Sequence, residues 1–185
     1  TENNIGAKLH VVKMQGYKRS YWFDETGLKW INPSPNLRSL KQAILYPGVA
    51  LAEGANVSVG RGTDTPFEVI GAPWMHAKDL SLYLNKRQIS GVSFKPVSFT
   101  PRSDIFRNRK CYGVRIVLED RNSLNVARLG IEIINALNRL YTKQFQLDKT
   151  LSLVGSHTTL QSIKKGNDPV VILSKCQDKL NQFRD

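Results

Sequence analysis

The segment from Glu53 to Trp74, EGANVSVGRGTDTPFEVIGAPW, most restricts what this chain can fold into. Its 22 positions contain four of the chain's 13 glycines and two of its 8 prolines. Glycine is entropically costly in a helix and proline breaks the helical hydrogen-bond ladder. The segment is therefore predicted to be a long shaped loop or a set of turns, and ordered loops of this length often carry function.

The rest of the chain alternates between strand-like and helix-like patterns. Strands are expected at Leu9–Met14, Val92–Thr100 and Tyr112–Glu119, and helices at Leu37–Ile44, Lys78–Arg87, Ser123–Lys143, His157–Lys165 and from Pro169 through Phe183. LYPG at 45–48 is expected to end the first helix, and Asn122 or Ser123 to cap the longest one. Pro96 favours an edge position or a bulge for its strand. The fold class is α/β, of the mixed α+β kind.

Composition restricts the class of partner. The net charge of +12 invites a nucleic-acid interpretation, but residues 1–100 contribute +5 and residues 101–185 contribute +7, whereas the Gly-rich segment has one Arg and three acids. A phosphate-binding protein would concentrate its cations where its shaped loops are, so nucleic acid is a disfavoured alternative. No apolar run is long enough to span a membrane, and the start has no signal-peptide pattern. Cys111 and Cys176 are isolated, so we expect two buried thiols and no metal site.

Two loops carry side chains suited to binding. Asn32-Pro33-Ser34-Pro35-Asn36 presents two amides and a hydroxyl on a stiff backbone, which suits a sugar, although these groups could instead satisfy the loop and cap the next helix. Gly60-Arg61-Gly62-Thr63 places an Arg where a carboxylate or phosphate can approach, although Arg61 could instead brace its own loop. The second motif lacks the Lys and spacing of a phosphate-binding P-loop.

Acidic and aromatic residues near these loops add candidates for carbohydrate chemistry. Glu53, Glu68, Asp64, Asp24 and Glu25 could supply the two carboxylates of a glycosidase. Trp30, Trp74 and Tyr46 could stack on a sugar ring or pack in the core. No histidine has an evident partner for a Ser-His-Asp triad.

Taken together, WINPSPN, LYPG and EGANVSVGRGTDTPFEVIGAPW resemble the signature of the NamZ-like exo-β-N-acetylmuramidases, formerly a bacterial domain of unknown function. One departure is Ala55, where the family usually has Thr. The resemblance implies a two-domain protein, with residues 1–45 ending a Rossmann-like first domain and its connecting loop, and 46–185 forming the C-terminal α/β domain. It also implies that the catalytic carboxylates precede Thr1, so this chain alone should be inactive.

The resemblance implies a glycoside hydrolase of peptidoglycan recycling that releases terminal N-acetylmuramic acid, with this part forming a substrate-binding wall. Its partners would be muramyl glycans and its own upstream domain, in the periplasm or outside the cell, with no cofactor or metal. Expected substrate-binding residues are Asn32, Ser34, Asn36, Tyr46, Glu53, Asn56, Ser58, Arg61, Thr63 and Trp74. No catalytic residue is assigned; Glu53 is the candidate if the chain contains one. A non-catalytic cell-wall glycan-binding module is the alternative.

Overall fold

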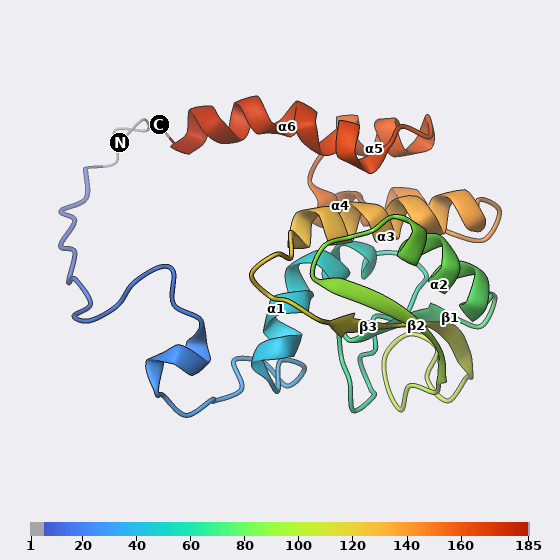
Figure 1. Ribbon diagram of the computed structural model, residues 1–185, viewed down its shortest axis with the longest axis horizontal. Coiled ribbons are helices and arrows are strands. Elements are labelled where there is room, and N and C mark those ends of the chain that lie inside the picture. Colours follow the sequence, from blue (N-terminus) through green and yellow to red (C-terminus); the bar gives the residue numbers. More distant parts are fainter. Residues whose placement is uncertain (1–5, 185) are drawn as a thin grey trace. The chain divides into compact units, whose positions relative to one another are not determined.

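The computed structural model describes residues 6–184 (Figure 1). The chain divides into two compact units, 1–30 and 31–185. The described part of the first unit contains the short 3-10 helix η1 (Phe23–Thr26), whose Phe23 ring lies edge-on to Trp30 at 5.1 Å. The strand expected at Leu9–Met14 is not formed, and Leu9 and Val12 are 82% and 92% exposed. A strand needs a partner for its backbone groups, and no described strand pairs with this stretch.

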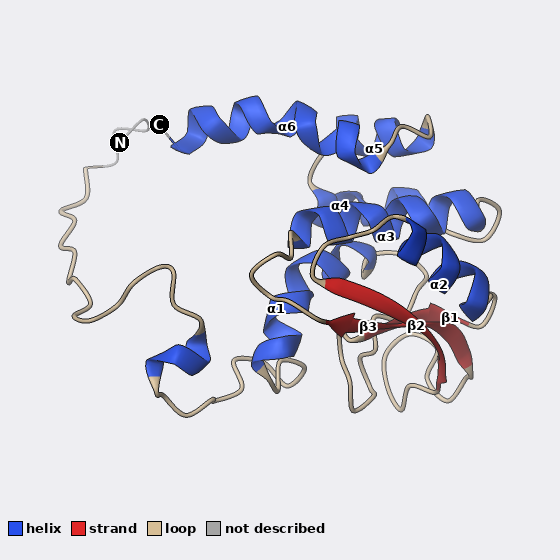
Figure 2. Cartoon of the chain, viewed as in Figure 1, coloured by secondary structure: helices blue, strands red, loops and turns tan. Residues whose placement is uncertain are grey.

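The second unit combines helices with one small sheet, which confirms the mixed class (Figure 2). Its elements are α1 (Leu40–Val49), η2 (Ala50–Ala52), β1 (Val69–Ala72), α2 (Ala77–Lys86), β2 (Val92–Phe99), β3 (Cys111–Leu118), α3 (Val126–Leu140), η3 (Leu147–Thr150), α4 (Leu151–Val154), α5 (His157–Lys164) and α6 (Pro169–Arg184).

The sheet is antiparallel with strand order β1-β3-β2, and α2 packs on one of its faces (Figure 1). Phe94 of β2 lies opposite Ile116 of β3, and both side chains enter the core. β2 is an edge strand, as Pro96 predicted. Its free edge is partly covered by α2, because the Asn85 side chain accepts from the Phe94 N–H and donates to the Phe94 carbonyl, at 2.9 and 2.8 Å. This contact saturates backbone groups that would otherwise be open to another strand.

Helix α1 passes through Pro47 and ends at Val49, so the expectation that LYPG ends it is wrong. The packing of α1 against α3 explains the difference. A Cβ on Gly48 would lie 2.5 Å from the carbonyl oxygen of Val126, and one on Gly130 would lie 2.6 Å from the carbonyl oxygen of Gly48. The two glycines let the helices cross closely, and this tertiary contact outweighs the local cost of proline.

Three further local expectations need correction. Asn125 caps α3, its Oδ1 accepting from the N–H of Arg128 at 3.0 Å, while Asn122 and Ser123 lie in the preceding turn around Asp120. Cys111 is buried as expected, but Cys176 is exposed on α6. The Gly-rich segment is not all loop, because it contains β1 (Val69–Ala72), which is buried throughout and pairs with β3.

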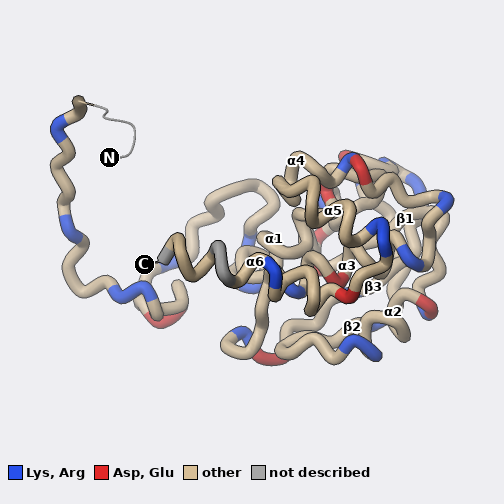
Figure 3. The backbone as a smooth tube through the Cα atoms, turned by 90° about the horizontal axis from the view of Figure 1, so that it is seen from above, with Lys and Arg blue, Asp and Glu red and all other residues tan. Residues whose placement is uncertain are grey.

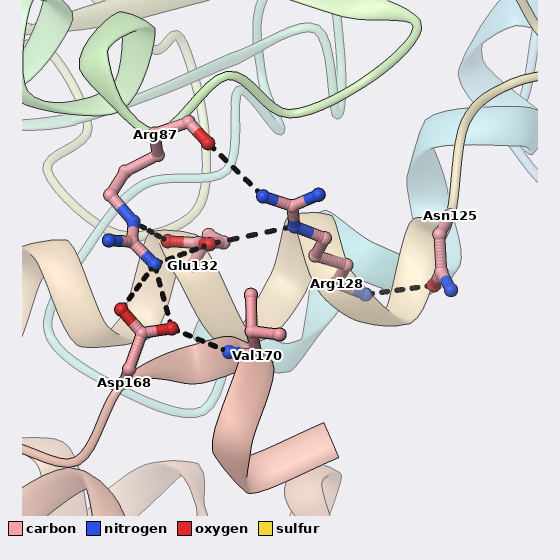
Figure 4. Close-up of polar contacts among 6 residues, drawn as sticks. All are labelled: Arg87, Asn125, Arg128, Glu132, Asp168 and Val170. Atoms are coloured by element: carbon pink, nitrogen blue, oxygen red, sulfur yellow. Dashed lines mark hydrogen bonds and ion pairs between the residues drawn. The ribbon is translucent and has the colours of Figure 1, made fainter. Parts of the chain in front are cut away.

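An ion-pair network joins the start of α6 to α2 and α3 (Figure 4). Glu132, fully buried in α3, accepts from Nε and Nη2 of Arg87 at 2.7 and 3.1 Å. Arg87 also donates to both oxygens of Asp168, whose Oδ1 accepts from the N–H of Val170 at 2.9 Å. Arg128 donates to the carbonyl of Arg87 at 3.1 Å. Arg87, Glu132 and Asp168 satisfy one another, and Nε of Arg128 lies 3.6 Å from Glu132, so we assign the network a structural role.

The positive charge of the chain is not confined to one helix or strand. Lys and Arg residues occur along the whole tube in Figure 3. Among the helices that the structure describes, none is long and apolar enough to cross a membrane.

Candidate functional site

A surface hollow of about 370 Å³ brings together three segments of the second unit. We call it the Arg61 hollow; it is lined by Asn36, Glu53, Arg61, Gly62, Ser103 and Asp104. Three of these residues, Asn36, Glu53 and Arg61, were predicted to bind substrate. They converge although 25 positions separate Asn36 from Arg61 in the sequence.

The turn from Gly60 to Thr63 places Arg61 at this hollow. Gly60 and Gly62 have φ of 81° and 75°, in the left-handed region that glycine adopts without strain. The carbonyl of Gly60 accepts from both the N–H and the hydroxyl of Thr63, at 3.1 and 2.6 Å, and the Thr63 hydroxyl accepts from the N–H of Thr65 at 3.1 Å. These bonds close the turn with the Arg61 side chain on its outside.

The Arg61 guanidinium lies between an acid and an aromatic ring. Its Nε forms an ion pair with Oε1 of Glu53, and its Cζ lies 5.3 Å from the ring centroid of Phe67. Phe67 is buried and makes an edge contact with Tyr46 at 4.9 Å. The Arg61 and Glu53 side chains are 30% and 27% exposed, so a ligand can reach the pair. The contacts with Glu53 and Phe67 fix the orientation of the Arg61 guanidinium.

The loop between β2 and β3 forms the wall that sequence reasoning missed. The N–H of Arg102 donates to the carbonyl of Gly62 at 2.8 Å, and a Cβ on Gly62 would lie 2.6 Å from the backbone of Ser103. Ser103 and Asp104 thereby reach the hollow from a segment that begins 41 positions after Gly62 in the chain. The density of glycine around Arg61 indicated a close approach, but no signal named the approaching segment.

Most of the other predicted site residues are engaged within the protein. The Asn56 side chain donates to the carbonyl of Gln144 and accepts from the N–H of Gln146, at 2.8 and 2.9 Å. Ser58 is buried and its hydroxyl accepts from the N–H of Gly60 at 3.2 Å. Ser34 accepts from the N–H of Asn36 through its hydroxyl at 3.4 Å, and Asn32 is exposed. The observed contacts of Asn56 and Ser58 brace the loops.

Trp74 lies at a different hollow from Arg61. That hollow, of about 420 Å³, is lined by Pro73, Trp74, Met75, His76, Ala77 and Tyr112. The ring of Trp74 contacts Tyr141 at 5.4 Å, and the Tyr141 hydroxyl bonds both the N–H and the carbonyl of His76 at 3.1 Å. Burial raises the pKa of Tyr141, so this hydroxyl stays protonated and can hold both contacts.

The remaining candidate carboxylates lie elsewhere. Glu68 is buried, where it contacts Nζ of Lys41 at 2.7 Å and Nε2 of Gln42 at 3.3 Å. Asp64 lies 3.7 Å from Nη2 of Arg102, with both side chains 81% exposed. Glu25, in the first unit, accepts from the N–H of Trp22 at 3.0 Å. No group of acids, histidines or cysteines among the described residues has the arrangement of a metal site.

Comparison with known sequences places these loops in a family. The family described as "Exo-beta-N-acetylmuramidase NamZ, C-terminal" matches residues 44–185, and its N-terminal counterpart matches residues 1–41. The chain belongs to the NamZ family. It is 36% identical, over 98% of its length, to the peptidoglycan β-N-acetylmuramidase NamZ of Bacillus subtilis strain 168.

Solved structures support the same relationship. Two crystal structures of DUF1343 family proteins from Bacteroides fragilis resemble this chain, with TM-scores of 0.68 and 0.60 at 26% and 28% identity. They cover 85% and 83% of this chain. This chain spans 45% of the Bacillus relative and 41% of each solved chain. The boundary expected near residue 45, between two domains of a longer protein, stays a prediction.

Proposed function

We propose that this chain is part of an exo-acting glycosidase that releases terminal N-acetylmuramic acid from peptidoglycan-derived glycans, and that the Arg61 hollow binds that sugar. The proposal is supported by the family membership and by the named activity of the Bacillus relative. The protein would act in the periplasm or outside the cell, where its substrate lies. It would need an upstream, Rossmann-like domain to supply the catalytic acids.

The observation that carries the proposal is the position of Arg61 at the hollow. N-acetylmuramic acid carries a lactyl carboxylate that N-acetylglucosamine lacks, and a guanidinium pairs with a carboxylate through two parallel hydrogen bonds. Glu53 engages the Nε of Arg61 and so orients its planar group. The amide of Asn36 and the hydroxyl of Ser103 line the same hollow and suit sugar hydroxyls or the acetamido group.

The test is the substrate preference of Arg61 variants in the complete protein encoded by the gene. A charge-assisted pair in a partly desolvated site is worth about 1.5 to 3 kcal/mol, so Arg61→Ala should lower kcat/KM for muraminides by roughly 10- to 150-fold. It should also shrink the preference for muraminides over glucosaminides. Arg61→Lys should restore activity only in part, because an ammonium cannot form the two-pronged contact.

The ion pair with Glu53 makes a bracing role for Arg61 the competing explanation. Glu53→Gln is the control, because it removes the internal partner and keeps the guanidinium. A bracing role predicts that both substitutions destabilise the protein and depress both substrates equally. An unchanged preference in a stably folded Arg61→Ala variant would therefore refute carboxylate recognition.

A separate experiment tests whether this chain needs an upstream domain for catalysis. The 185-residue chain alone should not hydrolyse a chromogenic β-N-acetylmuraminide, whereas the complete protein should. Turnover by the chain alone would overturn the domain assignment and move a catalytic role to Glu53 or Glu25. Binding of muramyl glycans without turnover by the complete protein would favour the glycan-binding module instead.

A further inference from the structure

The loop that walls the Arg61 hollow also concentrates positive charge. Residues 101–110 contain four cations and one acid, Asp104. The cations are Arg102, Arg107, Arg109 and Lys110, and all four are exposed. The Gly-rich segment on the other side of the hollow has the opposite balance, with one Arg and three acids. Of these two segments that line the hollow, residues 101–110 therefore carry the excess of positive charge.

The loop has a defined backbone, which fixes where each of its cations is attached. The carbonyl of Pro101 accepts from the N–H of Asn108 at 2.7 Å, which closes the loop on itself. Asp104, Phe106 and Asn108 have φ of 67°, 62° and 57°, and Phe106 packs against the core. The bond from Arg102 to Gly62 fixes the start of the loop to the hollow. Left-handed non-glycine residues are costly, and they persist where the surrounding contacts impose them.

Three of the cations have no acidic partner within the described part of the chain. Arg102 lies near Asp64, but no ion pair joins Arg107, Arg109 or Lys110 to another described residue. The charged group of Arg109 lies 5.5 Å from the ring of Phe106. That of Lys110 lies 5.6 Å from the ring of Tyr112. Aromatic contacts of this kind hold a cation without neutralising it, so the charges of Arg109 and Lys110 are available to an external anion. The exposed Arg107, which no ion pair joins to another described residue, is available as well.

We infer that residues 101–110 form a docking surface for a glycan strand that carries several carboxylates and continues from the sugar bound in the Arg61 hollow. This inference rests on the proposed function. A single exposed charge pair contributes only about 0.2 to 1 kcal/mol, so these cations have little effect on an isolated sugar. A strand that presents several carboxylates can contact several of these cations at once. Each contact raises the local concentration of the next carboxylate and so strengthens binding.

The acids around the loop favour such a strand over nucleic acid. Asp104 lies within the loop, Asp64 lies beside Arg102, and Glu53 lies in the hollow. A nucleic-acid duplex carries one phosphate charge per roughly 1.7 Å of its axis, so it would place phosphates against these acids. A glycan with one carboxylate per muramic acid residue is more sparsely charged and can avoid them.

The experiment neutralises the three available cations in the complete protein. The variant carries Arg107→Gln, Arg109→Gln and Lys110→Gln. Its control carries Lys78→Gln, Lys143→Gln and Lys165→Gln, which removes the same charge from exposed lysines outside the loop. We expect the loop variant to lose about tenfold in kcat/KM on strands of several disaccharides at low salt, with a smaller loss on a single-sugar muraminide. The difference should shrink towards physiological salt, where the Debye length is about 8 Å.

A binding measurement separates this inference from the proposed function. The 185-residue chain and its loop variant are titrated with the same glycan strands and with duplex DNA. Weaker strand binding by the loop variant alone supports the docking surface even if the complete protein releases no muramic acid. Muramidase activity with equal salt dependence in both variants refutes the docking surface and leaves the proposed function standing. An equal loss of DNA binding would show a general polyanion surface and also refute the inference.

Discussion

Replacing Glu132 by alanine should destabilise the second unit more than any single surface change. The Glu132 carboxylate is fully buried and contacts Arg87 through two hydrogen bonds and Nε of Arg128 at 3.6 Å (Figure 4). Removing it leaves two guanidinium groups facing each other, with Asp168 as the remaining acid. Breaking a buried ion pair costs about 3 to 5 kcal/mol. The Arg87 and Arg128 side chains are 25% and 28% exposed, so water offsets part of the loss and we expect about 3 kcal/mol.

The assay is urea unfolding of the 185-residue chain, followed by far-ultraviolet circular dichroism. With a urea dependence of about 2 kcal/mol per molar, a loss of 3 kcal/mol moves the midpoint down by about 1.5 M. Glu119→Ala is the matched control, because Glu119 is an exposed acid and such changes stay within about 0.5 kcal/mol. A loss below about 1 kcal/mol for Glu132→Ala, with an unchanged slope, would refute the assignment of the network as a structural clamp.

Acid should weaken the same network through Asp168. The N–H of Val170 and then the Arg87 guanidinium hold the pKa of this carboxyl below its ordinary value. A lowered pKa means that Asp168 stabilises the fold above its unfolded pKa of about 3.9, and that this contribution is lost as the pH falls through the folded-state value. Asp168→Asn should therefore be less stable at neutral pH and lose less stability on acidification. Parallel acid curves for both proteins would contradict this account.

Two other experiments test the loop contacts and the thiols. Gly62→Ala should cost about 1 to 3 kcal/mol more in unfolding free energy than Gly166→Ala. Both glycines have positive φ, but only a Cβ on Gly62 would meet Ser103. Equal costs would show that the strain of positive φ alone matters. A thiol reagent at about pH 8 should modify the exposed Cys176 and spare Cys111 in the folded chain, because burial raises the pKa of Cys111 to about 11. Mass spectrometry that finds Cys111 labelled first would contradict this prediction.

The elements that sequence predicted best are those with a long repeated pattern. The α3 residues Leu129, Ile133 and Leu137 recur every four positions and are all buried, so the helix was recognisable without its neighbours. β1 was missed because four residues that include Gly71 carry no alternation, and pairing with β3 creates the strand. The reverse occurred at Leu9–Met14, where a strand-like pattern has no described partner to pair with.

The sequence predicted the kind of chemistry at the candidate site, but it did not predict all the residues that form the site. A glycine-flanked Arg with nearby amides and acids indicated a binding loop, and Arg61, Glu53 and Asn36 do meet at one hollow. Side-chain chemistry alone could not show that Asn56 and Ser58 hydrogen-bond the backbone. It could not bring Ser103 to the hollow either, because that approach depends on the pairing of β2 with β3.

The glycines of the Gly-rich segment explain why binding and stability are hard to separate here. A Cβ on Gly54 would lie 2.5 Å from the carbonyl oxygen of Lys149, one on Gly62 would meet Ser103, and one on Gly71 would lie 2.6 Å from the carbonyl oxygen of Tyr112. Each of these three glycines marks a place where a distant segment touches the backbone directly, and Gly62 does so at the hollow itself. Changes at these positions should therefore lower stability and activity together. A change in the ratio between muraminide and glucosaminide turnover identifies a residue that contacts the lactyl carboxylate, and Arg61 is where that ratio is expected to move.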